Sequence, residues 1–124
     1  MKKLTETEEK IMQILWQLEN GFVKDVIAQF DDPKPPYTTI SSVIRILEQK
    51  GYLTHKQYGN TYEYYPAVSK DEYKKSYLQN IVKDYFGNSY QQLVSFFARE
   101  EDINIEKIQE ILEMIKKQKS GNNE

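Results

Sequence analysis

The stretch that most constrains the fold runs from Tyr37 to Leu53, with the sequence YTTISSVIRILEQKGYL. Four aliphatic side chains in it recur with the i, i+3, i+4, i+7 spacing of one helical stripe: Ile40, Val43, Ile44 and Leu47. Proline disfavours helical backbone at the preceding residue, so Pro35-Pro36 separates this helix from anything before it. Gly51 can adopt the left-handed conformation that ends a helix, and Tyr52 would then contact Leu47. We therefore predict one helix here, with its aliphatic stripe buried.

The opposite side of this helix carries small hydroxyls and one guanidinium, where an ordinary surface helix carries mostly Glu and Lys. By the same spacing, this side comprises Thr38, Ser41, Ser42, Arg45 and Gln49, with Thr39 next to it. Small hydroxyls allow close approach of another backbone, and in a DNA major groove Ser, Thr and Arg bind base edges or phosphates. By itself the pattern also fits a plain core helix, so the segment that follows is decisive.

A β-hairpin is predicted directly after the helix. Two runs rich in Thr and Tyr, 53–58 and 61–65, flank the two-residue loop Gly59-Asn60, which is typical of a tight hairpin turn. A helix followed at once by a hairpin is the second half of a winged helix, although a plain edge hairpin would share the pattern. Near the tip, four side chains could contact a sugar–phosphate backbone: Lys56, Tyr58, Asn60 and Thr61.

Before this helix, the chain supplies the remaining elements of such a domain. Thr5 and Glu8 have the spacing of a capping box, which predicts the start of a first helix. Phe22-Val23 is consistent with a short strand, and a second helix is predicted from Lys24 to about Phe30. We expect the single tryptophan, Trp16, to pack against another element. A winged helix-turn-helix domain is therefore predicted over residues 1–68.

The remainder, residues 69–124, is predicted to be a helical dimerisation domain. Its three predicted helices start at capping residues and are rich in Tyr, Phe and Ile, which about fifty residues can hardly bury alone. A two-fold dimer would cover them and present two recognition helices to a palindrome, whereas folding back onto the first domain is the alternative. The predicted interface residues are Tyr77 and the aliphatic stripe of the last helix, namely Ile108, Ile111, Leu112 and Ile115. The fold class is thus mostly α with one small β-hairpin.

Composition excludes several classes of function. The 124 residues contain no cysteine and one histidine, so a disulfide framework, a thiolate metal site and a histidine-rich zinc site are not expected. We find no P-loop, dinucleotide fingerprint or nucleophile motif, and predict no catalytic residue and no cofactor. No signal peptide or membrane-spanning run is evident, so we expect a cytoplasmic protein without direct membrane insertion.

The charge balance bears on nucleic-acid binding. A net charge of −2 argues weakly against a DNA-binding protein, since such proteins usually show a basic face. Between residues 34 and 56, however, Glu48 is the one acid beside four cations, which are Lys34, Arg45, Lys50 and Lys56. A basic face on an acidic protein is therefore compatible with the sequence.

The chain resembles the penicillinase-repressor family (BlaI/MecI/CopY type) of bacterial transcription regulators. The specific part is the segment from Tyr37-Thr38-Thr39-Ile40 to Lys50-Gly51-Tyr52-Leu53, followed by the Gly-Asn hairpin and Tyr64-Tyr65-Pro66. The resemblance implies a repressor that binds double-stranded operator DNA with inverted repeats as a homodimer. In the copper-responsive branch, C-terminal cysteines bind the metal, and this chain has none.

The resemblance also implies a mode of release. In the antibiotic-responsive members, a membrane sensor with a zinc-protease domain leads to cleavage of the repressor in its C-terminal domain. The matching bond lies between Phe96 and Phe97, where those members have Asn before the Phe. Two alternatives stay open: a winged-helix repressor released by a small ligand in its aromatic C-terminal half, and a winged-helix module that binds only protein.

Overall fold

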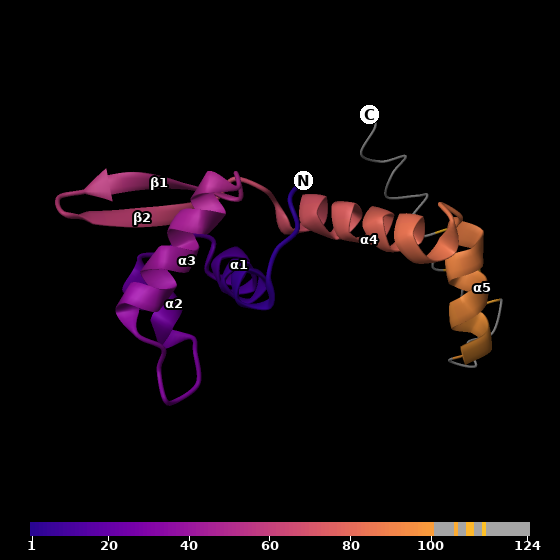
Figure 1. Ribbon diagram of the computed structural model, residues 1–124, viewed down its shortest axis with the longest axis horizontal. Helices are drawn as coiled ribbons and strands as arrows, with labels where there is room; N and C mark the ends of the chain where they lie inside the picture. Colours follow the sequence, from indigo (N-terminus) through magenta and orange to yellow (C-terminus); the bar gives the residue numbers. More distant parts are fainter. Residues whose placement is uncertain (101–105, 107–108, 111–112, 114–124) are drawn as a thin grey trace. The chain divides into compact units, whose positions relative to one another are not determined.

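The computed structural model describes residues 1–100 together with 106, 109, 110 and 113 (Figure 1). The described elements follow the order α1 (Glu6–Leu18), α2 (Val23–Ala28), α3 (Tyr37–Gln49), β1 (Leu53–Tyr58), β2 (Thr61–Pro66), α4 (Lys70–Phe86) and α5 (Tyr90–Glu100). The chain divides into two compact units, Met1–Ser76 and Tyr77–Glu124, and the boundary falls inside α4. The mostly helical class with one antiparallel hairpin is confirmed.

The three N-terminal helices begin where local capping permits. The hydroxyl of Thr5 accepts a hydrogen bond from the Glu8 amide (3.2 Å), and the Glu8 carboxylate accepts one from the Thr5 amide (2.7 Å), so the predicted capping box is confirmed. The start of α2 has no hydroxyl cap; the Asp25 carboxylate accepts from the Phe22 amide instead (2.9 Å). Pro36 precedes the first residue of α3, as expected.

The end of α3 is a Schellman motif. The amide of Tyr52 donates to the Leu47 carbonyl (2.9 Å), and the amide of Gly51 donates to the Glu48 carbonyl (3.0 Å). Gly51 has φ +88°, a conformation that a residue with a Cβ rarely adopts. The chain thereby reverses into β1, which pairs with β2 across the Gly59-Asn60 turn with Leu53 opposite Pro66 and Tyr58 opposite Thr61. The predicted hairpin and its loop are confirmed.

The first unit closes around one apolar core. Helix α3 packs against α1 and α2, and β2 covers parts of both (Figure 1). The buried apolar side chains come from all three helices and the hairpin, namely Ile11, Met12, Ile14, Leu15, Val23, Val26, Ile40, Ile44, Leu47, Tyr52, Leu53 and Tyr64, joined by Tyr73 of α4. Val43, predicted to belong to the buried stripe, is only half-buried. The core holds α3 with its opposite face outward.

One element was predicted wrongly. Phe22-Val23 does not form a strand, because Val23 is already the first residue of α2. The extended pairing lies just before it, where Gly21 and Tyr64 exchange two backbone hydrogen bonds of 3.0 and 2.7 Å. This bridge ties the turn between α1 and α2 to the second wing strand.

In the second unit, the helices expose much of their apolar surface. Ser89 caps α5 by accepting from the Gln92 amide (3.2 Å), as its position predicts. Val82 is the one described side chain of this unit that is almost fully buried. The predicted last helix lies largely outside the described residues, and so do Ile108, Ile111, Leu112 and Ile115. Four other residues of that segment are helical and exposed, namely Glu106, Gln109, Glu110 and Glu113.

Candidate nucleic-acid interface

The outward face of α3 presents most of the polar side chains that the spacing predicts. Thr38, Thr39, Ser42 and Arg45 are exposed. Ser41, predicted to be exposed with them, is instead 9% exposed, and its hydroxyl lies 3.4 Å from Arg45 Nη2, from which it accepts a hydrogen bond. Ser41 lines the groove between α3 and the wing together with Asn60 and Thr61, whereas Ser42 is not part of that lining.

The wing presents a second set of exposed polar side chains: Lys56, Tyr58, Asn60 and Thr61. Two short contacts stabilise the tip, since the Gln57 side-chain amide donates to the Gly59 carbonyl (3.1 Å) and the Thr61 hydroxyl donates to the Tyr58 carbonyl (2.9 Å). Lys56 Nζ lies 5.6 Å from the centre of the Tyr65 ring. The lysine therefore stays along the wing.

A groove of about 770 Å³ joins these two sets. It is lined by residues of α2, α3 and the wing, namely Phe22, Val23, Lys24, Tyr37, Ser41, Arg45, Asn60, Thr61, Tyr62 and Tyr64. The site residues Ser41, Arg45 and Asn60 thus lie along one concavity, although they are far apart in the sequence. Among the described residues of this lining, two are cations and none is an acid, which suits a polyanion.

Sequence reasoning missed three exposed members of this lining: Lys24, Tyr37 and Tyr62. One local signal existed for Tyr62, because it lies two residues before the buried Tyr64 and therefore on the same face of β2. Lys24 offers no such signal, since its place beside α3 depends on how α2 packs.

Glu48, the one acid between residues 34 and 56, lies next to the groove and contacts a histidine. Glu48 Oε2 lies 2.5 Å from Nδ1 of His55, whose ring also packs on Tyr62 with 4.6 Å between centroids. Burial raises the pKa of Tyr64, the Glu48 charge raises it further and the Arg45 charge lowers it, so this phenol stays neutral at ordinary pH. The contact with His55 holds the Glu48 carboxylate beside β1.

Two of the four cations near α3 have structural roles instead of facing the groove. Lys50 Nζ pairs with Glu8 Oε1 at 2.7 Å, and Lys34 Nζ donates to the Ala28 carbonyl (3.1 Å) and to the Phe30 carbonyl. Lys34 therefore satisfies carbonyls at the end of α2, where a cation is favourable. The charge available to a ligand comes from Arg45, Lys56 and the unpredicted Lys24.

The other predicted site residues lie on the second unit. Tyr77 is exposed on α4, and Phe96 and Phe97 are 44% and 49% exposed on α5. Among the residues that the structure describes, no group of His, Asp and Glu side chains could hold a metal ion. None of the described helices is long and apolar enough to cross a membrane.

Comparison with known proteins agrees with this geometry. The model of the penicillinase repressor family matches residues 4–117. The methicillin resistance regulatory protein MecI of Staphylococcus aureus is 24% identical over 120 residues, covering 93% of this chain and 94% of that protein. A penicillinase repressor of Staphylococcus aureus is 23% identical over 114 residues, covering 91% and 90%.

A solved structure shares the fold. The organohalide-sensing RdhR transcriptional regulator in its ligand-free form superposes with a TM-score of 0.50 at 12% identity, over 96% of this chain. The chain spans 64% of the length of that regulator. The family is one of transcriptional repressors and not of enzymes. With a winged helix whose recognition helix and wing share one basic groove, and with a family match over nearly its whole length, the chain belongs to the penicillinase repressor family of DNA-binding transcriptional regulators.

Proposed function

We propose that this repressor binds an inverted-repeat operator as a homodimer, with α3 in the major groove and the wing on the sugar–phosphate backbone. The observation that carries the proposal is the groove between them, where Arg45 of α3 and Asn60 and Thr61 of the wing line one concavity. Major-groove width admits a helix, and a wing beside it can reach the backbone.

Each candidate residue then has a distinct role. Thr38, Thr39 and Ser42 are small enough to let the α3 backbone approach the bases. Arg45, steadied by the Ser41 hydroxyl, can donate two hydrogen bonds to the O6 and N7 of a guanine. On the wing, Lys56, Tyr58 and Asn60 contact phosphates and sugars, which fixes the register but reads no sequence.

Two substitutions separate base reading from backbone contact. Arg45→Ala should cost about 1–3 kcal/mol of specific affinity, concentrated at one base pair. Lys56→Ala should weaken all sequences alike and lower the slope of log K against log salt by about 1. Both are measured by titrating fluorescent duplexes that carry each base substitution, at several salt concentrations.

Arg45→Lys is the matched control, since it keeps the charge and loses the bidentate geometry. Unchanged sequence preference in Arg45→Ala would move this residue to the phosphate contacts. A complete lack of specific, salt-dependent DNA binding would favour the module that binds only protein.

The homodimer is proposed from the apolar surface of the second unit. Six of its described aromatic and aliphatic side chains are large and exposed: Tyr77, Leu78, Tyr85, Tyr90, Phe96 and Phe97. A second copy would cover part of such a surface, the α5 side first, and its two-fold symmetry would match an inverted repeat. We assign the predicted stripe of Ile108, Ile111, Leu112 and Ile115 to the same interface.

Replacing Ile111 and Ile115 together by Glu tests the dimer. Two carboxylates in an apolar interface cost several kcal/mol, so sedimentation should show monomers and binding to the full operator should fall. The same variant should still bind an isolated half-site. A double variant that remains dimeric would place the interface elsewhere, with the exposed face of α4 as the next candidate.

For release, we propose proteolysis of the Phe96–Phe97 bond through a membrane sensor with a metalloprotease domain. Both side chains are exposed in the single chain, so a protease could reach the bond once α5 opens and the dimer contact that we assign to this surface is released. Cleavage would detach the last segment of the dimerisation unit and leave α3 intact, so the affinity gained by linking two half-sites would be lost.

Mapping repressor fragments by mass spectrometry after induction tests this release. A fragment that ends at Phe96 supports proteolysis. Derepression with the chain intact contradicts it and favours release by a small ligand.

A further inference from the structure

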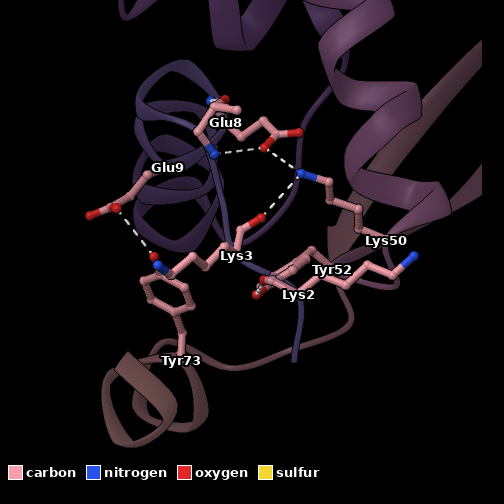
Figure 2. A network of polar contacts seen from close by, with 8 residues as sticks. Lys2, Lys3, Glu8, Glu9, Lys50, Tyr52 and Tyr73 are labelled. Carbon is pink, nitrogen blue, oxygen red and sulfur yellow. Dashed lines mark hydrogen bonds and ion pairs between the residues drawn. The ribbon is translucent and has the colours of Figure 1, made fainter. Parts of the chain in front are cut away.

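In the first turns of α4, Tyr73 contacts α1 and Tyr52, which follows the end of α3. Tyr73 is 9% exposed, and its hydroxyl donates to Glu9 Oε2 of α1 at 3.1 Å. Its ring lies 5.4 Å from the ring of Trp16 and 6.0 Å from the ring of Tyr52, measured between centroids. Figure 2 shows Tyr73 extending from α4 toward Glu9 of α1. All these residues belong to the first compact unit.

Tyr52 connects this attachment to the recognition helix. Its backbone amide closes the Schellman motif at the end of α3 (2.9 Å), and its hydroxyl donates to the Lys2 carbonyl. Two residues before Tyr52, Lys50 pairs with the buried Glu8 and also donates to the Lys3 carbonyl at 3.1 Å (Figure 2). The end of α3 and the start of α4 are therefore held by one cluster around the first turn of α1.

The segment between the wing and α4 is held as well. The Trp16 indole donates to the Val68 carbonyl (2.8 Å), and the Ala67 amide donates to the Tyr52 carbonyl (2.8 Å). These bonds leave little freedom in residues 67–69. From there α4 continues as one helix to Phe86, which lies in the second unit.

We propose that Tyr73 is a positioning residue that makes this repressor selective for one spacing between operator half-sites. The proposal rests on the dimeric function proposed above and adds the residue that fixes the direction in which α4 leaves the DNA-binding unit. Each base pair inserted between half-sites moves one of them by about 3.4 Å and rotates it by about 35°. A repressor whose α4 is fixed at Tyr73 cannot follow that change, whereas one with a loose junction can.

The test uses the full-length protein with Tyr73→Leu, which keeps apolar volume in the core but loses the phenol and its hydrogen bond to Glu9. The probes are an operator selected by the wild type from random duplexes, the same operator with one or two inserted base pairs, and a single half-site. The wild type should lose tenfold or more in affinity with two inserted base pairs. Tyr73→Leu should lose about tenfold at the selected spacing and less than threefold more on insertion, because its linked half-sites have a lower effective concentration but a wider reach.

Two variants make the result specific. Tyr73→Phe retains the ring contacts with Trp16 and Tyr52 and should restore most of the wild-type spacing preference. Lys75→Ala, an exposed position on the same turns of α4, should leave it unchanged. Single half-site affinity should be the same in all variants; a Tyr73→Leu loss that is equal on the half-site and on every spacing overturns the proposal, since it makes Tyr73 a stability residue only.

A second measurement does not depend on DNA. Because the chain has no cysteine, Gln13→Cys and Gln79→Cys can both be spin-labelled in one protein, placing one label on exposed positions of each unit. The distance distribution within a protomer, measured in dimers diluted with unlabelled protein, should be narrow in the wild type and broad with Tyr73→Leu. An equally broad distribution in the wild type and in Tyr73→Leu overturns the proposal that Tyr73 fixes α4. A narrow wild-type distribution, together with equal affinity for one and two half-sites, contradicts the dimeric function and not the role of Tyr73.

Discussion

The two units of this chain differ in how far they bury similar apolar side chains. In Met1–Ser76, aliphatic side chains of three helices and a hairpin meet in one core, and nine large side chains of the described chain, all but one in this unit, are almost fully buried. In Tyr77–Glu124, Tyr85 is 79% exposed, and Phe96 and Phe97 remain about half exposed. The first unit therefore buries most of its large apolar side chains, whereas the described part of the second leaves an exposed apolar surface, which supports the proposed association with a second copy.

The difference follows from how the helices are arranged in the sequence. The first unit has three helices in three directions and a hairpin that closes the remaining side, so each apolar stripe finds another. In the second unit, the ring of Phe86 at the end of α4 lies 5.7 Å from that of Phe96 on α5. The two helices that the structure describes in this unit leave large apolar side chains exposed, which supports the proposed association.

The largest expected effect compares the same substitution in both units. Leu47→Ala removes a fully buried side chain of α3 and should lower the free energy of unfolding by about 2–5 kcal/mol. Leu78→Ala, on the exposed face of α4, should cost less than about 1 kcal/mol. Urea titrations at low protein concentration, followed by circular dichroism and by the fluorescence of Trp16, measure both. Equal costs would mean that the second unit has a closed core of its own.

A smaller effect on the free energy of unfolding should appear in acid, where the Glu8–Lys50 ion pair of the first unit is lost. Burial by itself raises the pKa of Glu8, but hydrogen bonds from Lys50 and Thr5 and the Lys50 charge outweigh it and hold this pKa below its ordinary 4.5. A carboxyl whose pKa is lower in the folded state stabilises the fold above its ordinary pKa, and this contribution is lost as the pH falls through the folded value.

Glu8→Gln should therefore be less stable than the wild type by about 1–3 kcal/mol at pH 7, because Lys50 loses its charged partner. The two stability curves should converge below pH 4.5. Glu100→Gln, an exposed carboxylate of the second unit, is the matched control and should follow the wild type throughout. A constant gap between Glu8→Gln and the wild type down to strong acid would contradict the ion pair.

The next prediction concerns association. Phe97→Ala should raise the dimer dissociation constant about tenfold, as loss of an aromatic interface residue commonly costs 1–2 kcal/mol, while the monomer unfolds almost as before. Tyr37→Ala, which removes an exposed aromatic ring of the first unit, should leave dimerisation unchanged. Sedimentation equilibrium measures both, and the reverse order would assign the interface to the DNA-binding unit.

The smallest effect tests how far the interface reaches along α4. Tyr85→Ala should change the free energy of unfolding by less than about 0.5 kcal/mol, since its side chain is largely in water. We also expect less than a threefold change in the dimer dissociation constant, measured beside Phe97→Ala in the same sedimentation series. A larger change would extend the interface over this face of α4.

Much of the fold was determined by short-range sequence signals. The capping box at Thr5 and Glu8, the Schellman ending at Gly51 and the Gly59-Asn60 turn each involve residues within five positions of one another. Backbone hydrogen bonding and allowed φ angles decide such features locally, so sequence reasoning placed α1, α3 and the wing correctly. The exposed hydroxyl face of α3 followed from the same helical period, with Ser41 as the exception.

The tertiary structure decided which polar residues are available to DNA. Lys50 is paired with a carboxylate 42 positions away, Trp16 with a carbonyl 52 positions away and Tyr73 with a carboxylate 64 positions away. Lys24 of α2 and Tyr62 of the wing, by contrast, line the groove, although the sequence did not predict it. A pattern along the chain records the period of one element but not the neighbour that its side chains will meet. That neighbour is set by how the helices pack, and packing determines whether a lysine faces a phosphate or a buried glutamate.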